Sequence, residues 1–421
     1  MHTESPPAGT VSPAAPHPRS GDGPADPTWP RRAFLALLVC WLVLPLAQWG
    51  TFAEDAAPFV VAGRLAPEHP DAVYAGADGR VTERFEAEGC RFVPAGLDCA
   101  EFVLPFLSPP VAVAPLVVLG ALGDAVAVLV LRLLAAAAFA GGAWVLWKRL
   151  AEPDPAARVP LLAAMAVLTP FVSTVVHFGQ NAPLLFASAA IGLSRTDRGR
   201  HAAGAALVWV ASIATKLFPL ALAPLLLVRR KWLLLGWSAA LLVALAVLGA
   251  LVAPASLLGH FVDSSASLSG TRVTSVSNLS VDAGLHRWFD GWRDEGGAFA
   301  LALGARLAAF VGLYWWRLRD ADEDVQWSYA WVALLALHTQ VWWHYLAVLV
   351  PATAYAVRDR RAWWAVPGVA AVVTATAVIT DDALLVGVVP PVLLGAALAL
   401  PFVAARPARG AVSPAARAGT R

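Results

Sequence analysis

The sequence predicts an all-α protein that crosses a membrane many times, and three observations support this fold class. The chain of 421 residues is 58% hydrophobic and 14% charged, whereas a soluble domain is about 25% charged. Long apolar runs recur along almost the whole chain, and arginines gather between them. Because so few charges cannot cover a surface that faces water on every side, hydrocarbon must form part of the protein's surroundings.

The chain begins with a polar tail and a first apolar run. Residues 1–30 are rich in Pro, Gly, Ser and Ala, which predicts a disordered cytoplasmic tail, and residues 406–421 are expected to form a second one. Arg31 and Arg32 precede the apolar run 33–49. This start resembles a twin-arginine export signal, which would be cleaved. Because many apolar segments follow, we expect an uncleaved first membrane helix instead.

Residues 31–405 are predicted to form one membrane domain. A spanning helix needs roughly 20 apolar residues, so the runs predict a bundle of about 12 spanning helices. After the first run, the apolar runs occupy residues 105–121, 124–147, 159–176, 182–194, 202–228, 232–253, 297–316, 327–357, 362–379 and 383–405.

The placement of basic residues predicts which runs turn back within the membrane. Cytoplasmic loops carry an excess of Lys and Arg, and basic residues flank both ends of runs 202–228 and 327–357. Each run is therefore expected to be a hairpin, one turning near Lys216–Pro219 and the other near His338–Tyr345.

Runs 105–121 and 124–147 do not fit this scheme as two full spans. Two spans would place Lys148 and Arg149 outside, against the positive-inside rule. One of the two runs is therefore expected to be re-entrant or interfacial.

With the N-terminus inside, most of the unusual polar residues fall on the extracytoplasmic side. Loops 50–104 and 254–296 lie there, and the first is expected to carry short interfacial helices. Its Cys90 and Cys99 either form a disulfide in an oxidising compartment or remain two separate thiols. The sequence thus predicts an active site at the outer face.

Two charged residues are candidates for chemistry at that face. Asp55 directly follows the first helix, where a carboxylate partly removed from water suits a general base. The alternative is a solvated helix end, and Glu54 is a rival for the role. Lys216 stands in an apolar run, where a lysine costs roughly 2.5–3.5 kcal/mol at the bilayer centre. It is expected to hold a leaving phosphate, unless it snorkels to the interface.

Other polar residues could bind a substrate, each with a plain structural alternative. Gln180 and Asn181 suit sugar hydroxyls, but Gly and Asn also favour turns. His344 lies among Trp and Tyr, which indicates either an aromatic belt or a phosphate-binding platform. Arg272 is either a second phosphate ligand or a solvated arginine, and Asn278 in the same loop is a further sugar-binding candidate.

In their order and spacing, these residues resemble glycosyltransferase family 87, the polyprenol-phosphate-mannose-dependent mannosyltransferases of actinobacteria and their relatives. The resemblance covers residues 33–357 and departs at Ala56, where the family usually has an aromatic residue, at the long loop after Tyr74, and at Leu107–Pro110. The matching positions are Asp55, Ala62–Gly63, Tyr74, Gly179–Asn181, Ala203–Gly204, Lys216–Pro219, Asn278–Ser280 and Trp342–Tyr345.

The resemblance implies a C-type membrane glycosyltransferase fold and inverting transfer of a hexose, with mannose expected, from a polyprenyl-phosphate sugar. The acceptor would be a lipid or polysaccharide at the outer face of a bacterial plasma membrane. Asp55 would be the base, while Lys216, His344 and Arg272 would bind the donor phosphate. Gln180, Asn181, Asn278 and Tyr74 would bind sugar or acceptor.

The predicted function implies a set of partners, and two other functions are alternatives to it. We expect a lipid-linked donor, an acceptor and membrane lipids as partners, with no nucleic acid, no metal and no cofactor, because a lipid-linked sugar requires none. The alternative is a multi-pass transporter or lipid flippase, which would need access from both faces. A purely structural membrane protein would tolerate loss of Asp55, Lys216 and His344.

Overall fold

The computed structural model describes residues 28–76, 80–271, 278–289, 296–358, 362–379 and 382–404 of the protein. These residues form helices joined by turns, with no β-strand among them, which confirms the predicted all-α class. Six apolar segments are long enough to cross a membrane. They lie in α1 (Trp29–Ala47), α6 (Asp124–Leu146) with η4 (Trp147–Ala151), α7 (Pro155–Phe178), α11 (Trp232–Val252), α14 (Gly296–Leu313) with η7 (Tyr314–Leu318), and α18 (Asp382–Ala404).

Shorter helices account for the other apolar runs. The chain is therefore a membrane protein by length and composition, but fewer helices reach full spanning length than the predicted bundle contains. The shorter helices are α8 (Ala182–Ile191), α9 (Gly199–Thr215), η5 (Phe218–Leu222), α10 (Ala223–Val228), α15 (Glu323–Leu337), η8 (Trp343–Val348), α16 (Leu349–Val357) and α17 (Ala365–Val378).

The first loop folds into a group of short helices. These are α2 (Ala57–Leu65), η1 (Pro70–Ala72), α3 (Glu83–Gly89), η2 (Cys90–Phe92) and α4 (Cys99–Phe102), followed by η3 (Pro110–Ala112) and α5 (Val113–Gly120). Cys90 and Cys99 form a disulfide, with their Cα atoms 5.4 Å apart. Of the two alternatives for these cysteines, the structure has the bonded one.

Helix α5 settles which of the two conflicting runs does not span. It has eight residues, too few to cross a membrane, and packs against α2. A Cβ atom on Gly63 of α2 would overlap the carbonyl oxygen of Leu116, so the two backbones meet closely. Run 124–147 is the long helix α6, as one of the two predicted alternatives requires.

Both predicted hairpins are present. Helix α9 ends at Thr215, and the indole Nε1 of Trp209 donates to the carbonyl of Pro219 at 3.2 Å. Ten residues of continuous helix would separate these positions by about 15 Å, so the chain folds back on itself. In the second hairpin α15 ends at Leu337, and α16 packs back against it.

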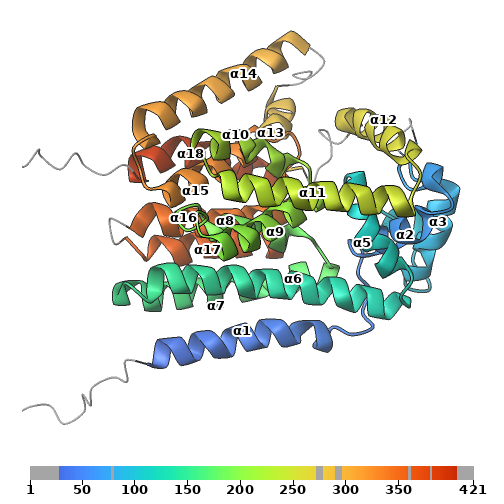
Figure 1. The fold of residues 1–421 in the computed structure, drawn as a ribbon, viewed down its shortest axis with the longest axis horizontal. Helices are drawn as coiled ribbons and strands as arrows, with labels where there is room; N and C mark the ends of the chain where they lie inside the picture. The colour runs from blue at the N-terminus through green and yellow to red at the C-terminus, as the bar shows by residue number, and fades with distance from the viewer. Residues whose placement is uncertain are drawn as a thin grey trace, which may run out of the picture.

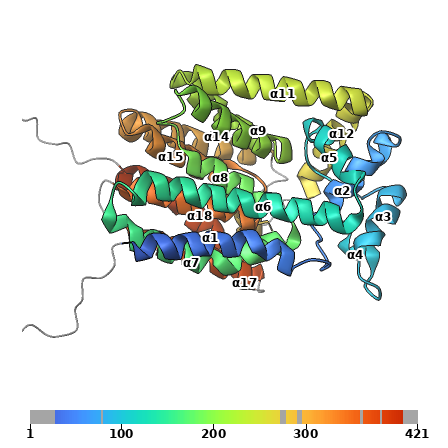
Figure 2. The same ribbon diagram turned by 60° about the horizontal axis from the view of Figure 1, so that its bottom comes forward.

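Figure 1 shows the long helices running along one common direction, with α2, α3, α5 and α12 (Ser256–Thr271) covering one end. Figure 2 shows the same end from another side, with α1, α6 and α7 side by side. We call this the capped end. The predicted tails 1–30 and 406–421 lie outside the described residues except for 28–30, of which Trp29 and Pro30 already belong to α1.

The opposite end, where α1 begins and α18 ends, is called the basic end. The loops that meet there are those predicted to be cytoplasmic, and ion pairs join them, of which the pair of Arg149 and Asp324 is buried on both sides. The pairs are Arg149 with Asp324 at 2.8 Å, Lys231 with Asp197 and with Glu323 at 2.7 Å each, and Arg358 with Asp322 at 3.2 Å.

Candidate active site

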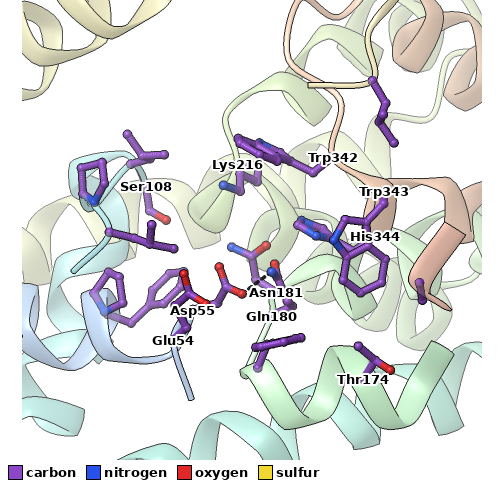
Figure 3. Close-up of a pocket in the computed structure, with 18 of the residues that line it drawn as sticks. Glu54, Asp55, Ser108, Thr174, Gln180, Asn181, Lys216, Trp342, Trp343 and His344 are labelled. Carbon is purple, nitrogen blue, oxygen red and sulfur yellow. Dashed lines mark hydrogen bonds between the residues drawn. The ribbon is translucent and has the colours of Figure 1, made fainter. Parts of the chain in front are cut away.

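A cavity of about 580 Å³ lies at the capped end, between the bundle and the short helices. Its walls are the start of α2, residues 104–108, the end of α7 and the facing ends of α17 and α18. Five of the predicted site residues line it together (Figure 3): Asp55, Gln180, Asn181, Lys216 and His344.

Asp55 is held by two hydrogen bonds to the turn after α7. It lies in the segment between α1 and α2, and its backbone N–H donates to the carbonyl of Phe178 at 3.1 Å. Its carboxylate accepts a hydrogen bond from the side-chain amide of Gln180. The position of the carboxylate is therefore set by residues more than a hundred positions away in the chain.

The turn itself requires a small partner. Gly179 ends α7 in the left-handed conformation, with φ of 72°, where glycine has no steric penalty. A Cβ atom at this position would lie 2.5 Å from the Cβ atom of Ala56. An aromatic residue in place of Ala56 would need a different packing here, which gives the departure at this position a structural reason.

Arg132 is a buried cation that our sequence analysis missed. It lies in α6 with 1% of its surface exposed. Its guanidinium connects the chain after α1 to the end of α7, the two segments that carry Asp55 and Gln180. A single arginine inside the apolar run 124–147 was the available signal. The acceptors are the backbone carbonyls of Gln48, Thr51, Phe52 and His177.

The electrostatic surroundings suit Asp55 to proton transfer near neutral pH. The pKa of Asp55 is raised to about 7: burial raises it most and the neighbouring charge of Glu54 adds to the rise, while Lys216 and the hydrogen bond from Gln180 act in the lowering direction. Burial also raises the pKa of Glu54. A carboxylate with a pKa close to the operating pH is an effective general base.

Lys216 is placed by a short relay of hydrogen bonds from the first loop. The Tyr74 hydroxyl donates to the carbonyl of Ser108 at 2.9 Å, and the Ser108 hydroxyl donates to the carbonyl of Thr215 at 2.8 Å. Lys216 follows in extended conformation, with Nζ 6.0 Å from the centre of the Tyr345 ring. Tyr74 itself does not line the cavity, so it supports the wall that carries Lys216.

His344 is almost fully enclosed, with 5% of its surface exposed. Its ring packs edge-on against Trp343 at 5.4 Å and Tyr345 at 4.7 Å between ring centres. Its Nδ1 atom and the Oδ1 atom of Asn181 are buried and have no hydrogen-bond partner in the described structure. Leaving such atoms unpaired is costly, so both are suited to a bound ligand.

Another predicted ligand lies beside the cavity. Asn278 does not line the cavity; its Oδ1 accepts from the backbone of Ser280 and Val341 at 3.0 Å each, and its Nδ2 donates to Thr339 at 2.9 Å. It holds the strand-like stretch that leads to His344. Arg272 lies outside the described residues. In the described residues, no three His, Cys, Asp or Glu side chains gather as metal ligands would.

A comparison with protein families assigns the chain to a family. The family model of glycosyltransferase family 87 matches residues 106–340, more than half of the chain. The matched region includes Gln180, Asn181 and Lys216. Searches of curated proteins and of solved structures give no match. The chain therefore belongs to glycosyltransferase family 87, and this makes it a membrane glycosyltransferase.

Proposed function

We propose that the protein transfers a hexose, with mannose as the first candidate, from a polyprenyl-phosphate sugar to a lipid or polysaccharide acceptor at the outer face of a bacterial plasma membrane. The observation that carries this proposal is the shared cavity of Asp55 and Lys216. It joins a carboxylate with a pKa of about 7 to a fixed ammonium group. These are the two groups that activation of a hydroxyl and departure of a phosphate require.

In the proposed reaction, the acceptor hydroxyl oxygen attacks the anomeric carbon of the donor from the face opposite the phosphate. The bond between this carbon and the phosphate oxygen breaks, so the configuration at the carbon inverts. Asp55 takes the proton of the hydroxyl. The polyprenyl phosphate leaves with the electron pair of the broken bond, and Lys216 stabilises its added negative charge.

The unpaired polar atoms of the cavity are suited to binding the phosphate and the sugar. The imidazole of His344 is a second phosphate ligand, and Arg272 stays a proposed third. The Oδ1 atom of Asn181 accepts from a sugar hydroxyl. Gln180 orients Asp55 beside the same sugar. Tyr74 and Asn278 act through the walls that they hold in place.

The apolar lining divides the cavity between the two substrates. Ser108, Glu54 and Asp55 lie on one side of the cavity, while Trp343, His344 and Thr174 lie on the other (Figure 3). We assign the acceptor to the first side, along α2 and residues 104–108. The polyprenyl chain then lies on the second side, where Phe178, Ile379 and Leu385 line the ends of α7, α17 and α18.

The charge distribution supports an outer active site. Basic loops face the cytoplasm in most membrane proteins, so the basic end is inside and the capped end, with its disulfide, is outside. We propose that the shorter helices also count toward the predicted bundle, although arms such as α8 are too short to cross alone and turn back within the membrane. The proposed spans are α1, α6, α7, α8, α9, η5 with α10, α11, α14, α15, η8 with α16, α17 and α18.

The ion pairs of the basic end argue against transport. A transporter must open its binding site to both faces in turn. Here the buried pair of Arg149 and Asp324 and the two ion pairs of Lys231 join four loops at the basic end. Opening that end would separate buried charges, which is costly. Transfer at one face needs no such opening.

The test is transfer by membranes that carry Asp55→Asn. Radiolabelled polyprenyl-phosphate mannose is supplied, with polyprenyl-phosphate glucose in parallel to test the sugar. We expect the variant to be present at normal level without transfer. Asp263→Asn, a change of the same kind at an exposed site on α12, is the control and should remain active. Full activity of Asp55→Asn would remove Asp55 from the mechanism.

A further inference from the structure

A second cavity, of about 780 Å³, lies at the basic end, far from the candidate active site. Three elements meet around it: the start of α1, the π-helix η4 and the start of α7. The lining residues are Thr28, Arg31, Arg32, Leu35, Trp147, Lys148, Glu152 and Arg158. The arginine pair that resembled an export signal is therefore part of a folded site.

The lining is strongly cationic. Among the residues that the structure describes, it holds four basic side chains and a single carboxylate, Glu152, which pairs with Lys148 at 2.7 Å. The nearby carboxylate of Asp154 is already occupied, because it caps the N–H of Ala156 and accepts from the indole of Trp363. The excess positive charge favours an anionic ligand.

The base of the cavity is aromatic and rigid. Trp147 is buried and stacks on Phe34, with ring centres 4.3 Å apart. The π-helix turn that carries Trp147 also carries Lys148, whose Nζ lies 5.0 Å from the centre of the Trp144 ring. Cationic groups thus surround an apolar floor, an arrangement suited to an amphipathic molecule.

An apolar strip leads away from the cavity along α1. Leu35, which lines the cavity, and Val39 and Leu42 are all exposed. Their spacing of four and three residues places them on one face of the helix. In a membrane this face meets hydrocarbon, so a ligand with its charge in the cavity can lay an acyl chain along it.

We propose that this cavity binds the phosphate headgroup of an anionic phospholipid of the inner leaflet, with an acyl chain on the Leu35–Val39–Leu42 face. Basic pockets between membrane helices on the cytoplasmic side are a recognised form of site for such headgroups. The continuity of the charged cavity with the apolar strip favours a lipid over a soluble phosphate compound. The proposal does not depend on the proposed transfer reaction.

The test is native mass spectrometry of the full-length protein in detergent with added phosphatidylglycerol. Each basic residue near an anionic lipid contributes about 1 kcal/mol, or roughly fivefold in affinity. The pair Arg31→Gln with Arg32→Gln should weaken binding about 25-fold, and Arg158→Gln alone about fivefold. Arg195→Gln with Arg198→Gln, two exposed sites at the same end outside the cavity, should change it less than about twofold.

Three results would overturn the proposal. Equal loss in the Arg195 and Arg198 control would mean diffuse attraction to the basic end. Equal binding of phosphatidylcholine would mean that no anion site exists. Displacement of the lipid by inorganic phosphate at similar concentration would indicate a site for a soluble phosphate. If the variant with Arg31→Gln and Arg32→Gln has a lowered unfolding temperature without lipid, the lipid affinity of Arg158→Gln becomes the test. An unchanged affinity in Arg158→Gln would then overturn the proposal.

Discussion

The side-chain amide of Gln180 donates a hydrogen bond to the carboxylate of Asp55, which lies 125 residues earlier in the chain. The same turn provides the carbonyl of Phe178 that accepts from the backbone of Asp55. The segment after α1 is thus tied to the end of α7 through both backbone and side chain. Any movement of that turn changes the surroundings of the proposed base.

The first prediction concerns pH. Because the proposed base acts in its ionised form and the pKa of Asp55 is about 7, kcat/KM should rise as the pH passes upward through this value. The measurement is kcat/KM for transfer from the lipid-linked donor across the neutral range. A profile that stays flat there would contradict the assignment of Asp55 as the titrating base.

Two substitutions should move this profile in opposite directions. Gln180→Leu removes a hydrogen bond to the ionised carboxylate, which raises the pKa of Asp55 and shifts the rise to higher pH. Glu54→Gln removes a like charge, which lowers that pKa and shifts the rise to lower pH. The same kinetic titration measures both. Shifts in the same direction would show that another group controls the profile.

Loss of the charge at Lys216 should slow the chemical step. Removing one preorganised electrostatic group from an active site costs about 10²–10³ in kcat, and we expect this range for Lys216→Met. Lys216→Arg keeps the charge and should retain more activity. Single-turnover transfer separates this effect from donor binding. An unchanged rate in Lys216→Met would place the leaving phosphate elsewhere.

Arg132 should matter for stability. Replacing it by Leu removes the guanidinium that donates to four backbone carbonyls at partly buried positions, so we expect the free energy of unfolding in detergent to fall by about 3 kcal/mol. Arg91→Leu changes a half-exposed ion pair and should cost less than about 1 kcal/mol. Denaturant unfolding compares the two variants. If Arg132→Leu and Arg91→Leu unfold with the same free energy, the hydrogen bonds of Arg132 contribute little to stability.

The disulfide predicts a labelling pattern. In the protein unfolded in SDS, a thiol reagent should modify one cysteine, Cys40, before reduction and three after it. The loop closed by Cys90 and Cys99 is short, so the bond should contribute about 2–3 kcal/mol. Mass spectrometry of the labelled protein counts the thiols. Three labelled cysteines without reduction would show that the bond is absent.

Much of the candidate site could be predicted because charged and polar side chains within apolar runs cost free energy. Lys216 and His344 lie within apolar runs, and a polar group there needs a cavity or a partner. The basic residues around runs 202–228 and 327–357 predicted two hairpins, and the structure contains both. These signals depend on composition along the chain and need no knowledge of packing.

The rest depends on where a side chain points, which a sequence does not show. Asn278 and Tyr74 were predicted to meet a substrate, yet in the structure they bond to backbone groups beside the cavity. Arg132 lies in an ordinary apolar run and satisfies carbonyls from two distant segments. Backbone partners of this kind arise from the tertiary arrangement, so only coordinates reveal them.

All residues that line the candidate active site lie at the capped end, while ion pairs join the loops at the basic end. In the proposed orientation, no cytoplasmic sugar can enter. The cell must therefore finish the lipid-linked donor and turn it outward before this protein can use it. In that case, transfer by this protein would depend on a separate translocation step that supplies outward-facing donor.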